Sequence, residues 1–132
     1  MSPAISVLIV EDDVLVGAVL KRAFHALGCT VRFLSDPRQL EAELESPAPA
    51  LIVSDLTMPG VSGVEVLCSA KRRWPATVRC LMSGSLEALM AEDLPRIEPC
   101  VLLSKPFRLE ELEALVRMAS PRHLEVRSAS AS

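Results

Sequence analysis

Five short apolar runs alternate along this chain with five stretches of helical character, and this alternation restricts the fold more than any other feature. The runs predict β-strands at residues 5–10, 30–34, 51–53, 78–82 and 101–103. The second run is the more polar, so we expect it near a sheet edge. Strands that alternate with helices through short connections imply right-handed crossovers. The sequence therefore predicts an α/β fold in which a doubly wound parallel sheet carries helices on both faces.

Capping residues and prolines give the limits of the expected helices. The first covers residues 16–27 and ends at Gly28, the second begins at Asp36-Pro37, and the third covers 64–73. Asp before Pro is a favoured helix start, and Gly is the usual residue just past a helix end. The fourth, at 86–93, is short and stopped by Pro95, so we expect it to be the least stable element. The last covers 109–119.

Length and composition bound the domain organisation and the partners. A chain of 132 residues, half of them hydrophobic, is expected to form one domain whose core is stable without disulfides or a structural metal. We expect a domain at 1–120 and a Ser/Ala-rich tail at 121–132 that is disordered or begins a linker. A net charge of −3 with 3% aromatic residues argues against nucleic-acid binding. No apolar run reaches membrane-spanning length and the start is no signal peptide, so we expect a cytoplasmic protein without a membrane contact.

The four cysteines are expected to be structural. Cys29, Cys68, Cys80 and Cys100 each lie in apolar sequence, and none forms a CxxC pair. A zinc site would need tighter spacing. We therefore expect small buried hydrophobic side chains in a reducing cytosol.

Chemically active residues follow four of the five strands. Glu11 and Asp12 follow the first, Asp55 the third, Ser83 the fourth and Lys105 the fifth. The carboxyl ends of parallel strands meet at one edge, where open α/β sheets bind ligands. Each residue also has a plainer interpretation: the acids as helix caps or loop starters, the serine as a turn residue and the lysine as a solvated charge. Their joint occurrence at the correct strand ends favours a site.

The charges indicate phosphoryl chemistry. Three clustered carboxylates repel one another, and a hard cation such as Mg²⁺ relieves that repulsion while accepting phosphate oxygens. The Lys105 ammonium supplies a compact positive charge suited to phosphate. A carboxylate can attack phosphorus to form an acyl phosphate, so Asp55 is the expected acceptor. Ser83 could hydrogen-bond a phosphoryl oxygen once that group is present.

Taken together, these motifs resemble the receiver domain of two-component response regulators. The resemblance covers residues 5–119. It rests on Val10-Glu11-Asp12, on Asp55-Leu56-Thr57-Met58-Pro59-Gly60 with Gly63, on Ser83-Gly84 and on Lys105-Pro106-Phe107. The family fold is a flavodoxin-like five-stranded sheet of order 2-1-3-4-5 with five helices.

The resemblance implies roles for the site residues. Asp55 would accept phosphate from a phosphohistidine of a histidine kinase or phosphotransfer protein. Glu11, Asp12 and Asp55, with the backbone carbonyl of Thr57, would bind Mg²⁺. Lys105 would contact the phosphoryl group and be joined to Pro106 by a cis peptide bond.

One position departs from the family pattern in a way that concerns switching. Receivers usually carry Tyr or Phe three residues before the lysine, and this chain has Leu102 there. That aromatic side chain normally changes rotamer when the Ser or Thr, here Ser83, moves toward the phosphate. Leu102 cannot do the same, so phosphorylation and switching become separate questions.

Three functions are compatible with parts of this pattern. The first is a phosphoswitch whose fourth helix, fifth strand and fifth helix bind an output partner, with a homodimer through that face left open. The second is a degenerate receiver that serves as a phosphorylation-independent binding scaffold. The third is a hydrolase with an aspartyl-phosphate intermediate, which is disfavoured because Thr57 occupies the usual general-acid position and no cap domain is present. We therefore expect no enzyme beyond self-phosphorylation and slow autodephosphorylation.

Overall fold

The five apolar runs form one parallel sheet in the computed structural model, which describes residues 4–120. The strands are β1 (Ser6–Val10), β2 (Thr30–Leu34), β3 (Leu51–Asp55), β4 (Val78–Ser83) and β5 (Val101–Ser104). Their order is β2-β1-β3-β4-β5, which confirms the expected fold class, and β2 lies at an edge as predicted. β1 and β3 are adjacent, with Val10 paired to Ser54, so the residues after β1 and the end of β3 lie together.

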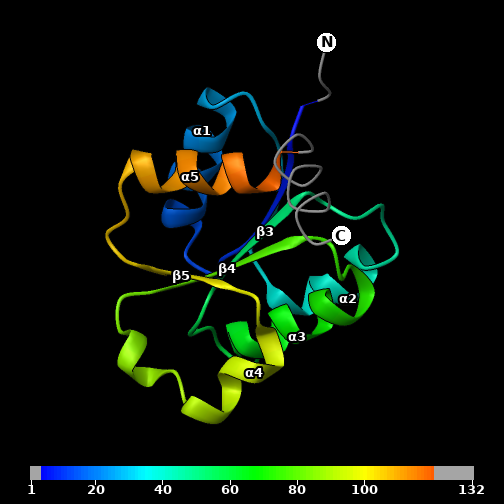
Figure 1. The fold of residues 1–132 in the computed structure, drawn as a ribbon, viewed down its shortest axis with the longest axis vertical. Helices are drawn as coiled ribbons and strands as arrows, with labels where there is room; N and C mark the ends of the chain where they lie inside the picture. The colour runs from blue at the N-terminus through cyan, green and yellow to red at the C-terminus, as the bar shows by residue number, and fades with distance from the viewer. Residues whose placement is uncertain (1–3, 121–132) are drawn as a thin grey trace, which may run out of the picture.

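Helices cover both faces of the sheet. They are α1 (Val14–Ala26), α2 (Leu40–Glu43), α3 (Gly63–Arg73), α4 (Leu94–Ile97) and α5 (Leu109–Ala119). Figure 1 shows α1 and α5 on one side of the sheet and α2, α3 and α4 on the other. This arrangement leaves the strand ends uncovered, which is where the predicted site residues lie.

Alternate side chains of the central strands fill two separate cores. On β3, Ile52 packs with the α3 side chains, whereas Leu51 and Val53 pack with α1 and α5 side chains such as Phe24 and Leu112. All five β3 residues are buried. Burying an aliphatic side chain of this size contributes about 1.5–3 kcal/mol, so β3, buried on both faces, is held firmly at the centre of the sheet.

The fourth helix differs from its prediction. Residues 86–93, expected to be helical, form two 3₁₀ turns, Leu86–Ala88 and Ala91–Asp93, and α4 follows as a single turn. Pro95 lies inside the first turn of α4 instead of stopping a helix before it. Proline is tolerated there because the first amides of a helix have no intrahelical acceptor. Arg96 joins this segment to α3 through Glu65, at 2.7 Å.

Other expectations can be compared directly. Leu109, expected on the buried stripe of the last helix, is 51% exposed because it lies at the first position of α5. All four cysteines are free thiols, three buried and Cys100 half-buried, which agrees with a structural role. The predicted tail at 121–132 lies outside the described residues. No helix among residues 4–120 is both long and apolar enough to span a membrane.

Candidate functional site

The three predicted carboxylates meet at the carboxyl edge of the sheet. Glu11 and Asp12 follow β1, and Asp55 is the last residue of β3. Each offers a carboxylate oxygen within 4.8 Å of the others. Glu11 and Asp55 are buried, and Asp12 is the more open of the three. Glu11 and Asp55 are 44 positions apart in the sequence, and the pairing of β1 with β3 brings them together.

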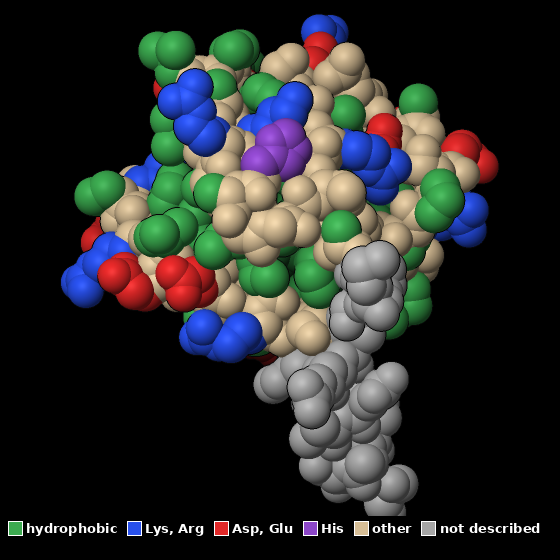
Figure 2. All heavy atoms as spheres, turned by 90° about the horizontal axis from the view of Figure 1, so that it is seen from above, with side chains coloured by type: hydrophobic (Ala, Val, Ile, Leu, Met, Phe, Trp, Pro, Cys, Tyr) green, Lys and Arg blue, Asp and Glu red, His purple; other side chains and the backbone are tan. Residues whose placement is uncertain are grey.

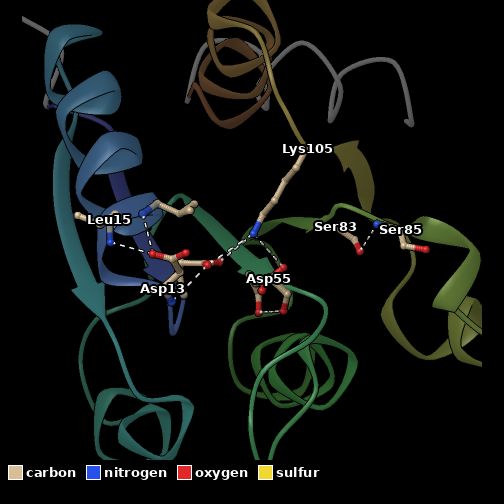
Figure 3. Close-up of polar contacts among 9 residues, drawn as sticks. Asp13, Leu15, Asp55, Ser83, Ser85 and Lys105 are labelled. Carbon is tan, nitrogen blue, oxygen red and sulfur yellow. Dashed lines mark hydrogen bonds and ion pairs between the residues drawn. The ribbon is translucent and has the colours of Figure 1, made fainter.

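Lys105 reaches the same cluster from the far side of the sheet. Its Nζ lies 3.2 Å from Asp55 Oδ1 and 3.5 Å from Glu11 Oε2. Figure 3 shows the Lys105 side chain pointing toward Asp55. Its backbone N–H donates to the Ser83 carbonyl at 2.8 Å, which ties the residue after β5 to the end of β4. The Lys105–Pro106 peptide bond is cis, in agreement with the resemblance.

Gly63 allows α3 to begin directly against the Asp55 backbone. A Cβ at this position would lie 2.1 Å from the Asp55 carbonyl oxygen, far inside van der Waals contact. The Gly63 N–H donates to the Leu56 carbonyl at 2.8 Å. Only glycine fits without displacing the peptide that carries the Asp55 carboxylate.

The Glu11 carboxyl is the most strongly perturbed group of the cluster. Its residue is 1% exposed. Burial, and then the Asp55 charge, raise the pKa of Glu11 to about 7, although Lys105 and the Asp13 backbone N–H oppose the shift. Glu11 would therefore bind a cation most readily above neutral pH, where its carboxyl has lost the proton.

The raised Glu11 pKa predicts that metal-free protein loses stability as pH rises from about 4.5 toward 7. The ionised form is disfavoured only in the folded state, so the loss is complete above the folded pKa and absent below the unfolded one. In EDTA at about pH 8, Glu11→Gln should be more stable than wild type by about 1–3 kcal/mol, with little difference below about pH 4.5. Denaturant unfolding at the two pH values measures this.

Asp13→Asn is the matched control for the Glu11 variant. Asp13 lies next to the cluster but caps α1, accepting from the N–H groups of Leu15 at 3.0 Å and Val16 at 3.3 Å. Asparagine caps a helix equally well. A Glu11→Gln variant no more stable than wild type at high pH would contradict the burial of an ionised Glu11.

The remaining predicted residues lie around this centre. Ser83 is buried, and its Oγ accepts from the Ser85 N–H at 2.9 Å (Figure 3). Thr57 lies in the exposed loop after β3. Leu102 projects from β5 and is 38% exposed.

Two contributors to the site were not predicted from the sequence. The approach of Lys105 to Glu11 as well as Asp55 depends on side-chain reach across β4, which no sequence signal gives. The sequence does show a glycine at the start of a helix, eight residues after Asp55. Its close contact with the Asp55 backbone was not predicted.

The donor set fits a hard divalent cation. All three acidic groups offer oxygen ligands, and the open Asp12 leaves a side for water or phosphate. The acidic cluster can therefore bind a metal, and Lys105 lies where it would neutralise charge on a group attached to Asp55.

Comparison with known proteins agrees with this geometry. Residues 7–117 match the model of the response regulator receiver domain. The chain belongs to this family. Such receiver domains are components of two-component systems.

Curated relatives of this receiver are transcriptional regulators of greater length. The DNA-binding transcriptional regulator NtrC of Salmonella typhimurium is 30% identical over 91% of this chain and 27% of that protein. The C4-dicarboxylate transport regulator DctD of Pseudomonas aeruginosa is 31% identical over 92% of this chain and 25% of that protein. The chain thus spans about a quarter of these relatives' length.

Solved receiver structures share the fold. The chemotaxis response regulator CheY4 of Vibrio cholerae has a TM-score of 0.75 at 21% identity and covers 89% of this chain and 99% of its own. NtrX of Brucella abortus has a TM-score of 0.81 at 21% identity, over 97% of this chain and 30% of its own.

Proposed function

We propose that this receiver accepts a phosphoryl group on Asp55 in an Mg²⁺-dependent transfer from the phosphohistidine of a histidine kinase or phosphotransfer protein. One observation carries the proposal: three carboxylates that can share a cation lie beside a lysine whose Nζ is 3.2 Å from Asp55. This pairing places a nucleophile and both kinds of charge that phosphoryl transfer needs at one edge of the sheet.

The chain's own residues divide the work of the transfer. An Asp55 carboxylate oxygen attacks phosphorus, the phosphorus–nitrogen bond breaks, and its electron pair stays on the donor imidazole. Glu11, Asp12, Asp55 and the Thr57 carbonyl would hold Mg²⁺, which supplies charge neutralisation at the phosphoryl oxygens. Lys105 would neutralise a further oxygen, and Ser83 would hydrogen-bond the product after leaving the Ser85 N–H. The chain turns over no external substrate in this scheme.

A small-molecule phosphodonor tests the proposal without a partner protein. Incubation with acetyl phosphate and Mg²⁺ should add a single phosphate to the chain, detected by intact mass, and EDTA should prevent it. Wild-type protein that remains unlabelled while folded and saturated with Mg²⁺ would refute the proposed function.

The exposed surface of α1 offers a docking place for the phosphodonor protein. Val14, Leu15 and Val19 are 60, 78 and 58% exposed, which is unusual for large aliphatic side chains in a row along a helix. Figure 2 views the side on which α1 and α5 lie, and Lys and Arg side chains surround a histidine there beside apolar patches. The patch begins just after the cap residue Asp13, so a bound donor would lie against Asp55.

A charge in the α1 patch should separate docking from chemistry. We expect Leu15→Asp to slow phosphate transfer from the cognate phosphohistidine protein at least about tenfold, since burying an unpaired carboxylate costs about 1.4 kcal/mol or more. Labelling by acetyl phosphate should be unchanged, because the Leu15 side chain is mostly exposed and Leu15 is not part of the cluster of Glu11, Asp12 and Asp55. Transfer kinetics with both donors measure the split. Equal slowing with both would show that the substitution damages the site instead.

Output would follow from a shift in the loop after β4 and in the α4, β5 and α5 face, which would bind a partner or a second copy in the cytoplasm. Leu102 favours a second candidate, a scaffold that binds its partner without phosphorylation. Partner affinities of wild type and Asp55→Asn distinguish the two, because a scaffold binds equally well in both forms and a phosphoswitch does not.

A further inference from the structure

A pocket lies where β4 and β5 begin, at the edge of the sheet opposite the acidic cluster. Its volume is about 370 Å³. Its walls come from the loop before β4, the loop before β5 and the last turns of α5, and they include Pro75, Val78, Pro99, Val101 and Met118. Parallel strands separate their two ends by their full length, so a ligand here would not touch Asp55.

Arg79 lines this pocket and is the residue that makes it unusual. It is 3% exposed, although arginine is rarely buried to this degree without an acidic partner. Its Nε donates to the Ile97 carbonyl at 3.0 Å. Its Nη1 donates to the carbonyls of Pro75 at 3.4 Å and Thr77 at 3.3 Å.

These contacts leave the outer nitrogen of Arg79 with unused hydrogen-bonding capacity. A guanidinium has five N–H donors, two of them on Nη2. Nη2 makes no hydrogen bond to any of the described residues. It is also not fully enclosed by protein atoms, so a ligand can reach it. The hydroxyl of Thr77, also in the lining, is already committed to the Pro49 carbonyl at 2.7 Å. Because Arg79 lines the pocket, Nη2 is the side-chain donor of this residue that a ligand there could use.

Arg79 also has no acidic partner in the part of the chain that the structure describes. No carboxylate between residues 4 and 120 lies within ion-pair distance of it. Burial lowers the pKa of Arg79, which reflects the cost of holding a cation away from water. Carbonyl dipoles offset part of that cost, and an anion in the pocket would offset more, with a charge-assisted hydrogen bond in addition.

We propose that this pocket binds a small organic acid whose carboxylate pairs with Arg79 Nη2 and whose aliphatic body packs on the apolar lining. The pocket volume suits a compact molecule. Its lining, mostly apolar with one charged group, is typical of small-molecule sites. Val78, Val101 and Met118 provide the apolar wall, and Arg79 provides the single charge. The same Arg79 donates to the carbonyl of Ile97 at the end of α4, so the ligand would be linked to α4 through Arg79.

Hexanoate is a suitable probe, and 1-hexanol is its uncharged counterpart of the same length. Hexanoate is titrated into the isotope-labelled protein at constant ionic strength. We expect saturable NMR chemical-shift changes at the Arg79 Nε–H and at the backbone amides of Cys100 and Val101. A charge-assisted hydrogen bond implies that 1-hexanol binds at least about tenfold more weakly. Comparable affinity for the two probes, or shifts located elsewhere, would overturn the proposal.

Two variants make the test independent of folding. Arg79→Gln should lose the preference for hexanoate over 1-hexanol, but it also removes bonds to three carbonyls and could unfold the edge. Met118 is a half-buried residue of the pocket wall, and tryptophan at this position should fill the pocket while Arg79 stays in place. Met118→Trp should therefore abolish binding of both probes, with an NMR spectrum that is still that of a folded protein. Undiminished hexanoate binding by Met118→Trp would show that the ligand occupies another place.

Discussion

The Asp55→Asn variant should take up no phosphate under conditions in which wild type is fully labelled. The amide oxygen of asparagine is a poor nucleophile and carries no charge, so no acyl phosphate forms. The fold should survive, because Asp55 is hydrogen-bonded into the strand ladder by its backbone and asparagine has nearly the same shape. Intact-mass analysis after incubation with acetyl phosphate and Mg²⁺ measures the result directly.

Asp13→Asn provides the matched control for this loss of labelling. It also removes an acid beside the cluster, but Asp13 points at the N–H groups of α1 and lies outside the group of three carboxylates (Figure 3). It should label like wild type. Phosphate retained in Asp55→Asn, at whatever residue, would mean that Asp55 is not the acceptor.

Lys105→Ala should bind Mg²⁺ yet fail to respond to phosphorylation. The carboxylates that would hold the cation follow β1 or end β3, so they should remain in place. The variant loses the ammonium 3.2 Å from Asp55, which would neutralise phosphoryl oxygens in the transfer and in the product. Removing a single preorganised donor of this kind costs about 10²–10³ in rate, so labelling should slow by about that factor. Mass-resolved labelling kinetics measure the rate.

The loss of the response to phosphorylation in Lys105→Ala is measured separately from the rate of labelling. Once Lys105→Ala has been labelled slowly, the amide signals of Ser83 and Ser85 should stay where they are in unphosphorylated protein, because nothing draws the loop after β4 toward the phosphate. Lys21→Ala, which removes an exposed lysine of α1, should label and shift as wild type does. Normal switching in Lys105→Ala would refute the role assigned to the lysine.

The parts of the fold that the sequence predicted are those encoded locally. The apolar run before Asp55 and the Pro-Gly after it define β3 without reference to the rest of the chain. The positions of Glu11, Asp55 and Lys105 after their strands then follow from the rule that parallel strands end at one edge. Asp36-Pro37 likewise begins its helical segment by a local capping contact, with Asp36 Oδ1 2.9 Å from the Arg38 N–H.

What the sequence did not predict depends on tertiary contacts. The segment before β5 has weak helical preference, so its contacts with α3 through Arg96 decide where α4 lies. Arg79 lies in a mostly apolar strand, and its hydrogen bond to the carbonyl of Ile97, 18 residues away, is a tertiary contact that the sequence does not reveal. The raised Glu11 pKa depends on burial by neighbouring elements in the same way.

Carboxylates from two separate segments lie where they could share a cation beside Lys105. Crystals grown or soaked with Mn²⁺ would locate that ion by anomalous scattering, without assumptions about its ligands. We expect a single peak bonded to carboxylate oxygens of Asp12 and Asp55, with Glu11 adjoining and Lys105 on the far side of Asp55. A peak elsewhere, or an empty cluster at saturating metal above neutral pH, would contradict a shared cation at this place.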